Sequence, residues 1–162
     1  TTLHAYLMGK SEYVQYDLSK LIDSSNTLII PNGYFNENSV TSFNISNNGV
    51  LKSIVIGDNC FGKVRVFDLN GLSELESVVI GQKSFTYAKT REEIWNKVRT
   101  DGTYQIMNCP KLKSIQIGYI SFGDYRSFEL NNLPSLQSID MGHRCFYYAP
   151  IFSLTGLIDG MV

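Results

Sequence analysis

A repeated pattern of apolar residues limits, more than any other feature, what this chain can fold into. The segment Leu-Lys-Ser-Ile-Gln-Ile-Gly at Leu112 restarts as Leu-Gln-Ser-Ile-Asp-Met-Gly at Leu136, so the pattern recurs after 136 − 112 = 24 residues. It also begins at Leu51 and Leu75, and the interval 112 − 75 = 37 residues is 13 longer than the others. A fixed period of this length predicts a solenoid, in which each repeat buries its apolar side against its neighbours.

Each repeat contains two short runs in which apolar and polar residues alternate, Leu-x-Ser-Ile-x-Ile and x-x-Phe-x-Leu. Alternation with period two is typical of strands that are buried on one face. We therefore expect a mainly-β leucine-rich-repeat solenoid with two strands per 24-residue coil and one short helical insertion. Two aromatic columns should fill the core, and their members are Phe35, Phe61, Phe85, Phe122, Phe146 and Phe43, Phe67, Tyr104, Phe128, Phe152.

The repeats divide the chain into three parts. Residues 1–24 fit a degenerate N-terminal capping repeat, because the outer face of a terminal unit meets water. An amphipathic helix over residues 11–22 is the alternative. Residues 25–157 hold five repeats, with the extra residues inserted at 89–101, and residues 158–162 form a C-terminal tail.

The insertion carries signals of a short helix. Thr90 and Glu93 form a capping box, and Gly102 is placed to end a helix of about nine residues. Its apolar residues, which are expected to pack on something, are Ile94, Trp95 and Val98. They can pack on the flank of the solenoid, or Trp95, the single tryptophan, can anchor a partner, since tryptophan is enriched in binding hot spots.

Two columns of turn residues are expected to hold left-handed or tight backbone conformations. The first column follows the first strand and consists of Gly57, Gly81, Gly118 and Gly142. The second column follows the second strand and consists of Gly71, Asn108, Asn132 and Gly156.

Bulk composition excludes several classes of function. The formal net charge is −1, so the chain lacks the basic excess that nucleic-acid binding requires. It contains no apolar run of 18 residues, so we expect no transmembrane segment.

Cys60 and Cys145 lie three repeats apart in one column, roughly 14 Å at the strand spacing, and Cys109 lies in another column. We therefore expect no internal disulfide.

Catalytic and metal-binding patterns are not evident. The two histidines, His4 and His143, lie far apart in the repeat order, and Cys145 should point inward, away from His143. Metal-ligand spacings such as C-x-x-C are missing, and the carboxylates are expected on outward columns. The sequence thus predicts a non-enzymatic protein without a cofactor or a metal.

The motif I-G-x-x-[CS]-F, as in Ile56-Gly-Asp-Asn-Cys-Phe61 and Ile117-Gly-Tyr-Ile-Ser-Phe122, resembles the BspA-like leucine-rich repeats of bacterial and protist proteins. The resemblance covers residues 25–157. It implies a flattened coil with strands on both sides, and membership among surface adhesins or host-contact proteins. The asparagine column of the best-known leucine-rich repeats is replaced here by Asn59, Lys83, Ile120 and Arg144, so we expect no asparagine ladder to hold the coils together.

One outward column of the first strand is apolar in the N-terminal half. Ile29, Val55 and Val79 are followed by Gln116 and Asp140, which suits a contact surface, although strand propensity alone also favours such residues. The matching column of the second strand is polar and suits a solvated face. The sequon Asn44-Ile45-Ser46 favours, weakly, a cell-surface or extracellular location over a cytoplasmic one.

Two functional hypotheses follow. The first is a binding module for a protein partner, or for a glycan, whose contact residues are Trp95, Ile94, Val98, Ile29, Val55 and Val79. The second is a structural repeat subunit that self-assembles or supports a filament.

Overall fold

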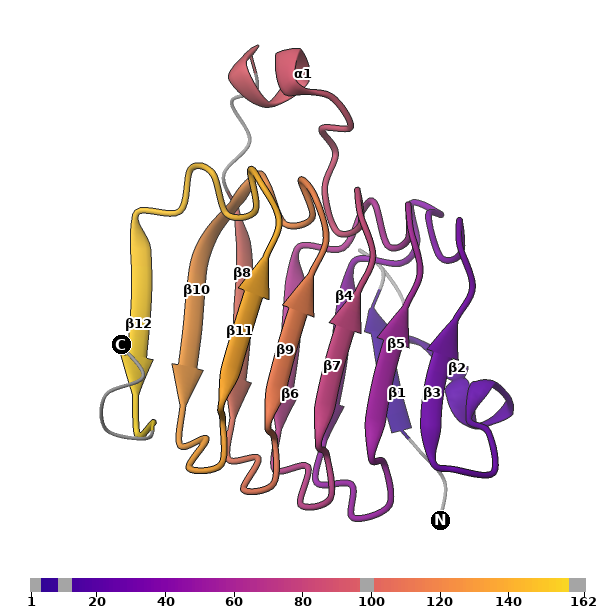
Figure 1. Cartoon of the computed structure of the whole chain (residues 1–162). Coiled ribbons are helices and arrows are strands. Elements are labelled where there is room, and N and C mark those ends of the chain that lie inside the picture. The colour runs from indigo at the N-terminus through magenta and orange to yellow at the C-terminus, as the bar shows by residue number, and fades with distance from the viewer. Residues whose placement is uncertain (1–3, 9–12, 97–100, 158–162) are drawn as a thin grey trace.

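The molecule is a flattened solenoid whose turns each contribute one strand to each of two facing sheets (Figure 1). The computed structural model describes residues 4–8, 13–96 and 101–157. Equivalent strands of successive coils lie about 24 residues apart in the sequence, and one short helix lies outside the stack. These features confirm the predicted mainly-β solenoid with two strands per coil and one helical insertion. In the described part of the chain, no helix is long and apolar enough to cross a membrane.

The first sheet has five parallel strands in the order β11-β9-β7-β5-β3. Its strands are β3 (Thr27–Ile30), β5 (Ser53–Ile56), β7 (Ser77–Ile80), β9 (Ser114–Ile117) and β11 (Ser138–Met141). Repeat positions pair in register, as Ile54 with Val78 and Val78 with Ile115. The register therefore continues without a shift across the 37-residue interval between Leu75 and Leu112, which holds the insertion.

The second sheet has seven strands in the order β12-β10-β8-β6-β4-β1-β2. Its strands are β1 (His4–Met8), β2 (Tyr13–Asp17), β4 (Ser42–Ser46), β6 (Val66–Asn70), β8 (Gly102–Met107), β10 (Tyr125–Asn131) and β12 (Ile151–Thr155). The five strands of the repeats are parallel, whereas β1 is antiparallel to both β4 and β2. The N-terminal segment thus extends this sheet by a hairpin.

A 3-10 helix, η1 (Leu18–Leu21), follows β2 and packs against β3. Its Leu18 is 1% exposed, and Ile22 forms a bridge with Leu28 of β3. Residues 13–17 form a strand, so the alternative of a helix through this segment is wrong. The capping role of residues 1–24 stays a prediction, and the tail at 158–162 lies outside the described residues.

Stacked aromatic rings fill the space between the sheets. Along one column, ring centroids are 5.3 Å apart for Phe43 and Phe67 and 4.7 Å apart for Phe67 and Tyr104. Rings of the two columns meet edge to face, as Phe67 and Phe122 do at 5.4 Å. Eight of the ten predicted aromatic residues are buried. The exceptions, Phe35 and Phe152, belong to the first and the last coil.

The left-handed backbone conformations of the first turn are not where the sequence predicted them. Apart from Gly33, they occur at non-glycine residues, and the phenylalanines of this turn have φ angles between 50° and 62° (Phe35, Phe61, Phe85, Phe122 and Phe146). Even the β-branched Ile120 has φ 63°, an unfavourable conformation for such a residue. The second column is confirmed, because Gly71, Asn108, Asn132 and Gly156 all have positive φ.

The glycines of the first column serve a different purpose, since they let neighbouring coils approach. Their φ angles are not in the left-handed region. A Cβ atom at Gly118 would lie 2.6 Å from the carbonyl carbon of Gly81, and one at Gly142 would lie 2.7 Å from the backbone nitrogen of Tyr119. Of the two expected conformations, left-handed or tight, the left-handed one is wrong here, and backbone proximity is the reason that glycine stands at these positions.

All three cysteines are free thiols, as predicted. Cys60 and Cys145 share a hydrogen-bonding position with serines: Cys145 Sγ donates to the carbonyl of Gly118 at 3.0 Å, and Ser121 Oγ donates to that of Gly81 at 2.6 Å. Burial raises the pKa of Cys145 to about 12, which keeps this thiol protonated and poorly nucleophilic at neutral pH.

An asparagine ladder exists, although in a different turn from the one the sequence analysis considered. Asn108 Nδ2 donates to Asn70 Oδ1 at 3.0 Å, and Asn132 Nδ2 donates to Asn108 Oδ1 at 2.8 Å. The expectation that no such ladder holds the coils together is therefore wrong. The ladder lies at the end of the second strand, where the left-handed Asn108 and Asn132 follow their strands and Asn70 is the last residue of β6.

We expect Gly118→Ala to lower the free energy of unfolding by about 3 kcal/mol or more, because the new methyl group would overlap backbone atoms that cannot move independently. Gly33→Ala is the matched control, since Gly33 has φ 80° but no atom within 4 Å of its Cβ position, so only about 1–2 kcal/mol of backbone strain is expected. Urea denaturation followed by circular dichroism measures both. Equal losses would contradict the assignment of coil contact to this column.

Candidate interaction surfaces

The insertion contains helix α1 (Arg91–Asn96), and its start is the predicted capping box. The backbone N–H of Glu93 donates to Thr90 Oγ1 at 3.2 Å, and the N–H of Thr90 donates to Glu93 Oε2 at 3.3 Å. Val98 lies outside the described residues. Gly102 is the first residue of β8, so the expectation that it ends the helix is wrong.

The two described apolar residues of α1 have opposite environments. Ile94 is fully buried and packs with Ala88 and Ile120 on the flank of the solenoid. Trp95 is 50% exposed, and the guanidinium of Arg91 lies 4.1 Å from the centroid of its ring. The helix is thus fixed by Ile94, while Trp95 faces solvent, and the role of both residues in binding stays a prediction.

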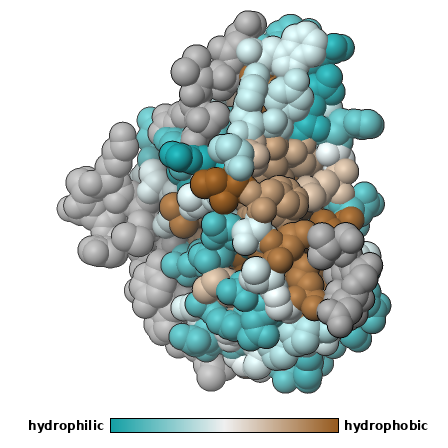
Figure 2. All heavy atoms as spheres, turned by 90° about the vertical axis from the view of Figure 1, so that its left-hand side faces the viewer, coloured by the Kyte–Doolittle hydropathy of each residue, from teal (hydrophilic) through white to brown (hydrophobic). Residues whose placement is uncertain are grey.

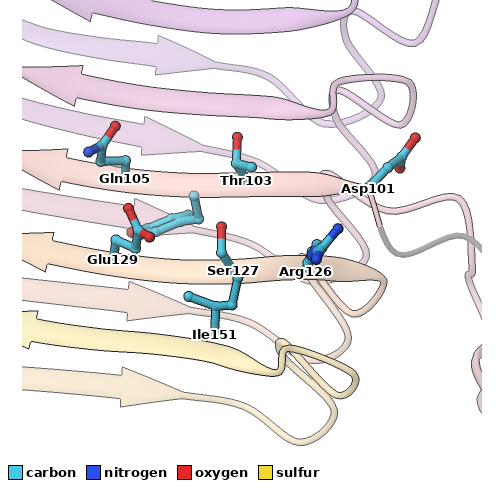
Figure 3. Close-up of a pocket in the computed structure, with 8 residues that line it drawn as sticks. Asp101, Thr103, Gln105, Arg126, Ser127, Glu129 and Ile151 are labelled. Carbon is cyan, nitrogen blue, oxygen red and sulfur yellow. The ribbon is translucent and has the colours of Figure 1, made fainter.

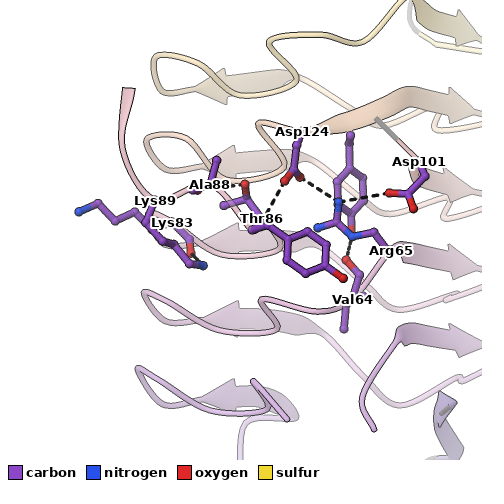
Figure 4. A network of polar contacts seen from close by, with 10 residues as sticks. Val64, Arg65, Lys83, Thr86, Ala88, Lys89, Asp101 and Asp124 are labelled. Atoms are coloured by element: carbon purple, nitrogen blue, oxygen red, sulfur yellow. Dashed lines mark hydrogen bonds and ion pairs between the residues drawn. The ribbon is translucent and has the colours of Figure 1, made fainter. Parts of the chain in front are cut away.

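A buried ion pair ties the insertion to the stack (Figure 4). Arg65 Nη1 lies 3.0 Å from Asp124 Oδ1, and Asp124 Oδ2 accepts a hydrogen bond from the backbone N–H of Tyr87 at 3.0 Å. The Arg65 guanidinium lies 4.3 Å from the ring centroid of Tyr87 and 4.9 Å from that of Tyr125. Arg65 also lies 3.6 Å from Asp101, so the segments before and after the insertion both meet at this arginine.

Sequence reasoning missed this cluster. The carboxylates were expected on outward columns, but the Asp124 side chain is only 1% exposed, so that expectation is wrong for this residue. Asp124 lies in the turn before β10, and Arg65 lies just before β6, two strands away in the sheet. No signal in the sequence relates the two residues, because they lie 59 residues apart and belong to no repeated column.

Lys89, at the entrance to the insertion, is an ammonium group in a partly dehydrated position. Its pKa is lowered to about 8, chiefly by burial; Asp124 opposes this shift, and the nearby Lys63 and Arg65 add to it. The Nζ atom donates to the backbone carbonyl of Lys83 at 2.8 Å.

The outer row of the five-stranded sheet is formed as the sequence predicted. Ile29 pairs in register with Val55, and Val55 with Val79, after which the row continues to Gln116 and Asp140. Ile29 is 42% exposed, while Val55 and Val79 are half-buried. This row is therefore accessible, and its part in partner binding stays a prediction.

The outer face of the seven-stranded sheet has a depression of about 530 Å³ (Figure 3). It is lined by hydroxyl, amide and charged side chains from β8 and β10, with Ile151 of β12 at its border, and its polar members are Asp101, Thr103, Gln105, Arg126, Ser127 and Glu129. The register changes between Tyr125 and Ser127 and leaves Arg126 as an extra residue. The sequence predicted the polar face but not its hollow, because a bulge leaves no periodic signal.

The residues with nucleophilic or metal-binding chemistry do not converge in the described part of the chain. His143 is exposed in a turn, whereas the Cys145 thiol donates to a backbone carbonyl. No group of three or more histidine, cysteine or carboxylate residues there is placed to hold a metal ion. The surfaces can offer apolar contact and hydrogen bonds.

Comparisons with models of known families, with curated proteins and with solved structures give no match to this chain.

We expect Asp124→Ala to lower the free energy of unfolding by about 3 kcal/mol, because it would leave the buried Arg65 charge with only the more distant and exposed carboxylate of Asp101 as a partner. The double variant Arg65→Met, Asp124→Leu should lose less than the single variant. The exposed pair of Lys111 and Glu74, 2.7 Å apart, provides the control, and Lys111→Met should change stability little. The free energy of unfolding is measured by urea denaturation. Equal losses in Asp124→Ala and Lys111→Met would contradict the role of the ion pair.

The pKa of Lys89 predicts a rise in stability between about pH 8 and pH 10.5. In this window the unfolded chain holds a proton that the folded chain has lost, so raising the pH favours folding. Lys89→Met should therefore stabilise the protein by about 1 kcal/mol at pH 7, after allowance for solvent screening, and by less at pH 10. In Lys89→Arg, which stays charged, the rise should disappear. Thermal melts across this range measure the difference, and parallel curves for the native chain and Lys89→Arg would contradict it.

Proposed function

We propose that this protein is a non-catalytic interaction module of the leucine-rich-repeat type, which binds a protein partner through the insertion helix and the outer face of its five-stranded sheet. The resemblance to BspA-like repeats supports the repeat type and a location at the cell surface. The structural use of the thiols, which donate to carbonyls inside the stack, supports a role in binding rather than in catalysis.

The observation that carries the proposal is the fixed presentation of Trp95. Its helix is held by the capping box, by the burial of Ile94 and by the ion pair at its root. Arg91 stacks on the exposed indole ring and limits its motion. A large aromatic side chain that is ordered before binding loses little conformational entropy when a partner covers it.

A glycan is the alternative ligand, and the polar depression of the seven-stranded sheet favours it. Its hydroxyl, amide and carboxylate groups lie on neighbouring strands and point to the same side (Figure 3). Such groups can hydrogen-bond a polar chain that lies across the sheet. A second class of function, a structural subunit of an assembly, is favoured by apolar side chains exposed at the C-terminal end of the stack.

The test is affinity capture from the native source with three baits, the native chain, Trp95→Ala and Ile29→Ser. Trp95→Ala should lose the partner, with affinity lower by roughly 30-fold or more, as expected for a hot-spot residue. Ile29→Ser should weaken the same contact if the sheet row shares it. Binding of the captured protein to each purified bait is then measured by calorimetry.

Exposed Val50, at 41%, provides the matched control, because Val50→Ser removes apolar surface from a loop before β5 rather than from either proposed contact. Unchanged circular dichroism spectra establish that all variants fold. Equal capture and equal affinity with Trp95→Ala and with the native chain would rule out the helix as the binding site.

A further inference from the structure

The turn after β4 is stabilised differently from the equivalent turns of the later coils. In those turns a backbone carbonyl accepts a hydrogen bond from the N–H of the leucine three residues later, at 3.2 to 3.4 Å, and the pairs are Leu72 with Leu75, Cys109 with Leu112 and Leu133 with Leu136. Asn48 occupies the corresponding position in the first coil. Its side-chain Oδ1 accepts hydrogen bonds from the N–H groups of Val50 and Leu51, both at 2.8 Å. A side-chain amide therefore replaces the backbone acceptor in this turn.

Asn48 is followed by Gly49, and an asparagine–glycine pair can lose its side-chain amide without an enzyme. The glycine nitrogen, which no Cβ atom hinders, attacks Cγ of the asparagine. A bond from this nitrogen to Cγ forms, the nitrogen gives up its proton to water, and the side-chain amide nitrogen takes up a proton and leaves as ammonia. Water then opens the resulting succinimide at either carbonyl, which yields aspartate or isoaspartate. The chain contains three such pairs, Asn32-Gly33, Asn48-Gly49 and Asn70-Gly71.

The structure distinguishes the three pairs by the hydrogen bond of the glycine nitrogen. The N–H of Gly33 donates to the carbonyl of Asp58 at 2.9 Å, and the N–H of Gly71 donates to the carbonyl of Met107 at 3.1 Å. Both acceptors belong to the next coil, so each nitrogen must break a contact between coils before it can attack. The N–H of Gly49 donates to no atom in the part of the chain that the structure describes. Only this nitrogen is available without local opening.

The amide of Asn48 is also the most strongly polarised of the three. Attack at Cγ places negative charge on Oδ1, and two N–H donors at 2.8 Å are positioned to stabilise that charge. Oδ1 of Asn32 accepts one backbone hydrogen bond, from Asp58, and Oδ1 of Asn70 accepts one from the side chain of Asn108. The turn after β4 therefore combines an available nucleophile with a polarised amide.

Water, which completes the reaction, can reach this turn. Asn48 is half-buried, and Gly49 is exposed. The turn lies at the edge of the solenoid opposite to α1 (Figure 1). Where this edge is seen from the C-terminal end of the molecule, at the bottom of Figure 2, it is covered mainly by hydrophilic residues.

We propose that Asn48 is a site of spontaneous deamidation, which proceeds through a succinimide formed with Gly49. In the folded chain, Asn32 and Asn70 keep their amides, because the adjacent glycine nitrogens are held by the next coil.

The two products have different effects on the first coil. Aspartate keeps an oxygen that can accept from the N–H groups of Val50 and Leu51. Isoaspartate adds a main-chain atom to the turn and displaces this acceptor. Since Leu51 is 1% exposed and begins the next coil, the isoaspartate form should pack less well at the start of the stack. This inference goes beyond the proposed function, because it concerns a covalent change at the edge opposite to the insertion helix.

The experiment is incubation of the intact chain at mildly alkaline pH, followed by peptide mass spectrometry that separates aspartate from isoaspartate. In the folded chain, Asn48 should lose its amide at least about tenfold faster than Asn32 or Asn70, since each of those pairs must first break a hydrogen bond between coils. In concentrated urea the turns are lost, and the three pairs should react at similar rates. Asn48 should react at least as fast in the folded chain as in urea.

Gly49→Ala provides the matched control. A Cβ atom at Gly49 would lie 3.5 Å from Ser73 Oγ, an ordinary contact, and the φ angle of Gly49 is not in the left-handed region, so this variant should fold. Its circular dichroism spectrum checks this. The added methyl group hinders the attacking nitrogen and should bring the rate at Asn48 down to that of the two protected pairs. The rates at Asn32 and Asn70 should stay unchanged.

Three outcomes would overturn the proposal. Loss of the amide of Asn32 or Asn70 as fast as that of Asn48 in the folded chain would show that the glycine hydrogen bonds give no protection. An Asn48 amide that persists in the folded chain but is lost in urea would show that the turn shields it. Equal rates at Asn48 in folded Gly49→Ala and in the native chain would show that the glycine nitrogen is not the nucleophile.

Discussion

The structure depends on one constraint, the close stacking of successive coils at the spacing of parallel strands, about 4.8 Å. Three kinds of residue satisfy it in the turn after the first strand of each of the four later coils. A glycine lets the backbones approach, as at Gly118, a small hydrogen-bonding side chain such as Ser121 reaches the preceding coil, and a phenylalanine stacks on its equivalent. The aromatic ring requires an uncommon left-handed backbone at residues such as Phe122. Since ring stacking occurs in every coil, this conformational cost is offset by contacts that repeat along the molecule.

The insertion shows how the stack accepts an interruption. The parallel register between β7 and β9 is unchanged on either side of it, so the added residues leave the sheet at one coil edge and return there. At that edge Arg65 and Asp124 form a buried ion pair. Burying two charges is favourable only when they are well paired. The aromatic faces of Tyr87 and Tyr125 on the guanidinium, and the hydrogen bond that Asp124 accepts from Tyr87, supply the surrounding contacts.

The sequence predicts those features that repeat, and it fails where a single three-dimensional contact decides. The two strands of each repeat, the aromatic columns and the unpaired thiols follow from the period, because each recurs at a fixed offset. The purpose of the glycines at Gly118 and its equivalents does not follow, because a tight turn and a close approach favour the same residue. Arg65 and Asp124 lie 59 residues apart and occur once, so no periodicity relates them. The depression beside Arg126 depends on a bulge, and the open face of Phe152 depends on its place in the last coil, which its column does not reveal.

The distinction between repeated and single features also decides which residues are informative about function. The stack requires a phenylalanine or a glycine at its inward and turn positions, so these residues reveal little about what the protein binds. The outward row of the five-stranded sheet is under no such requirement, and its change from Ile29 to Asp140 therefore reflects the surroundings of each position. Trp95 is the clearest case, because neither the repeat nor the core needs a tryptophan there. Its helix is already fixed by Ile94, and an indole ring that is 50% exposed contributes little to folding. A residue that the fold does not need, on an element that the fold nevertheless holds in place, is the basis of our proposal that Trp95 contacts a partner.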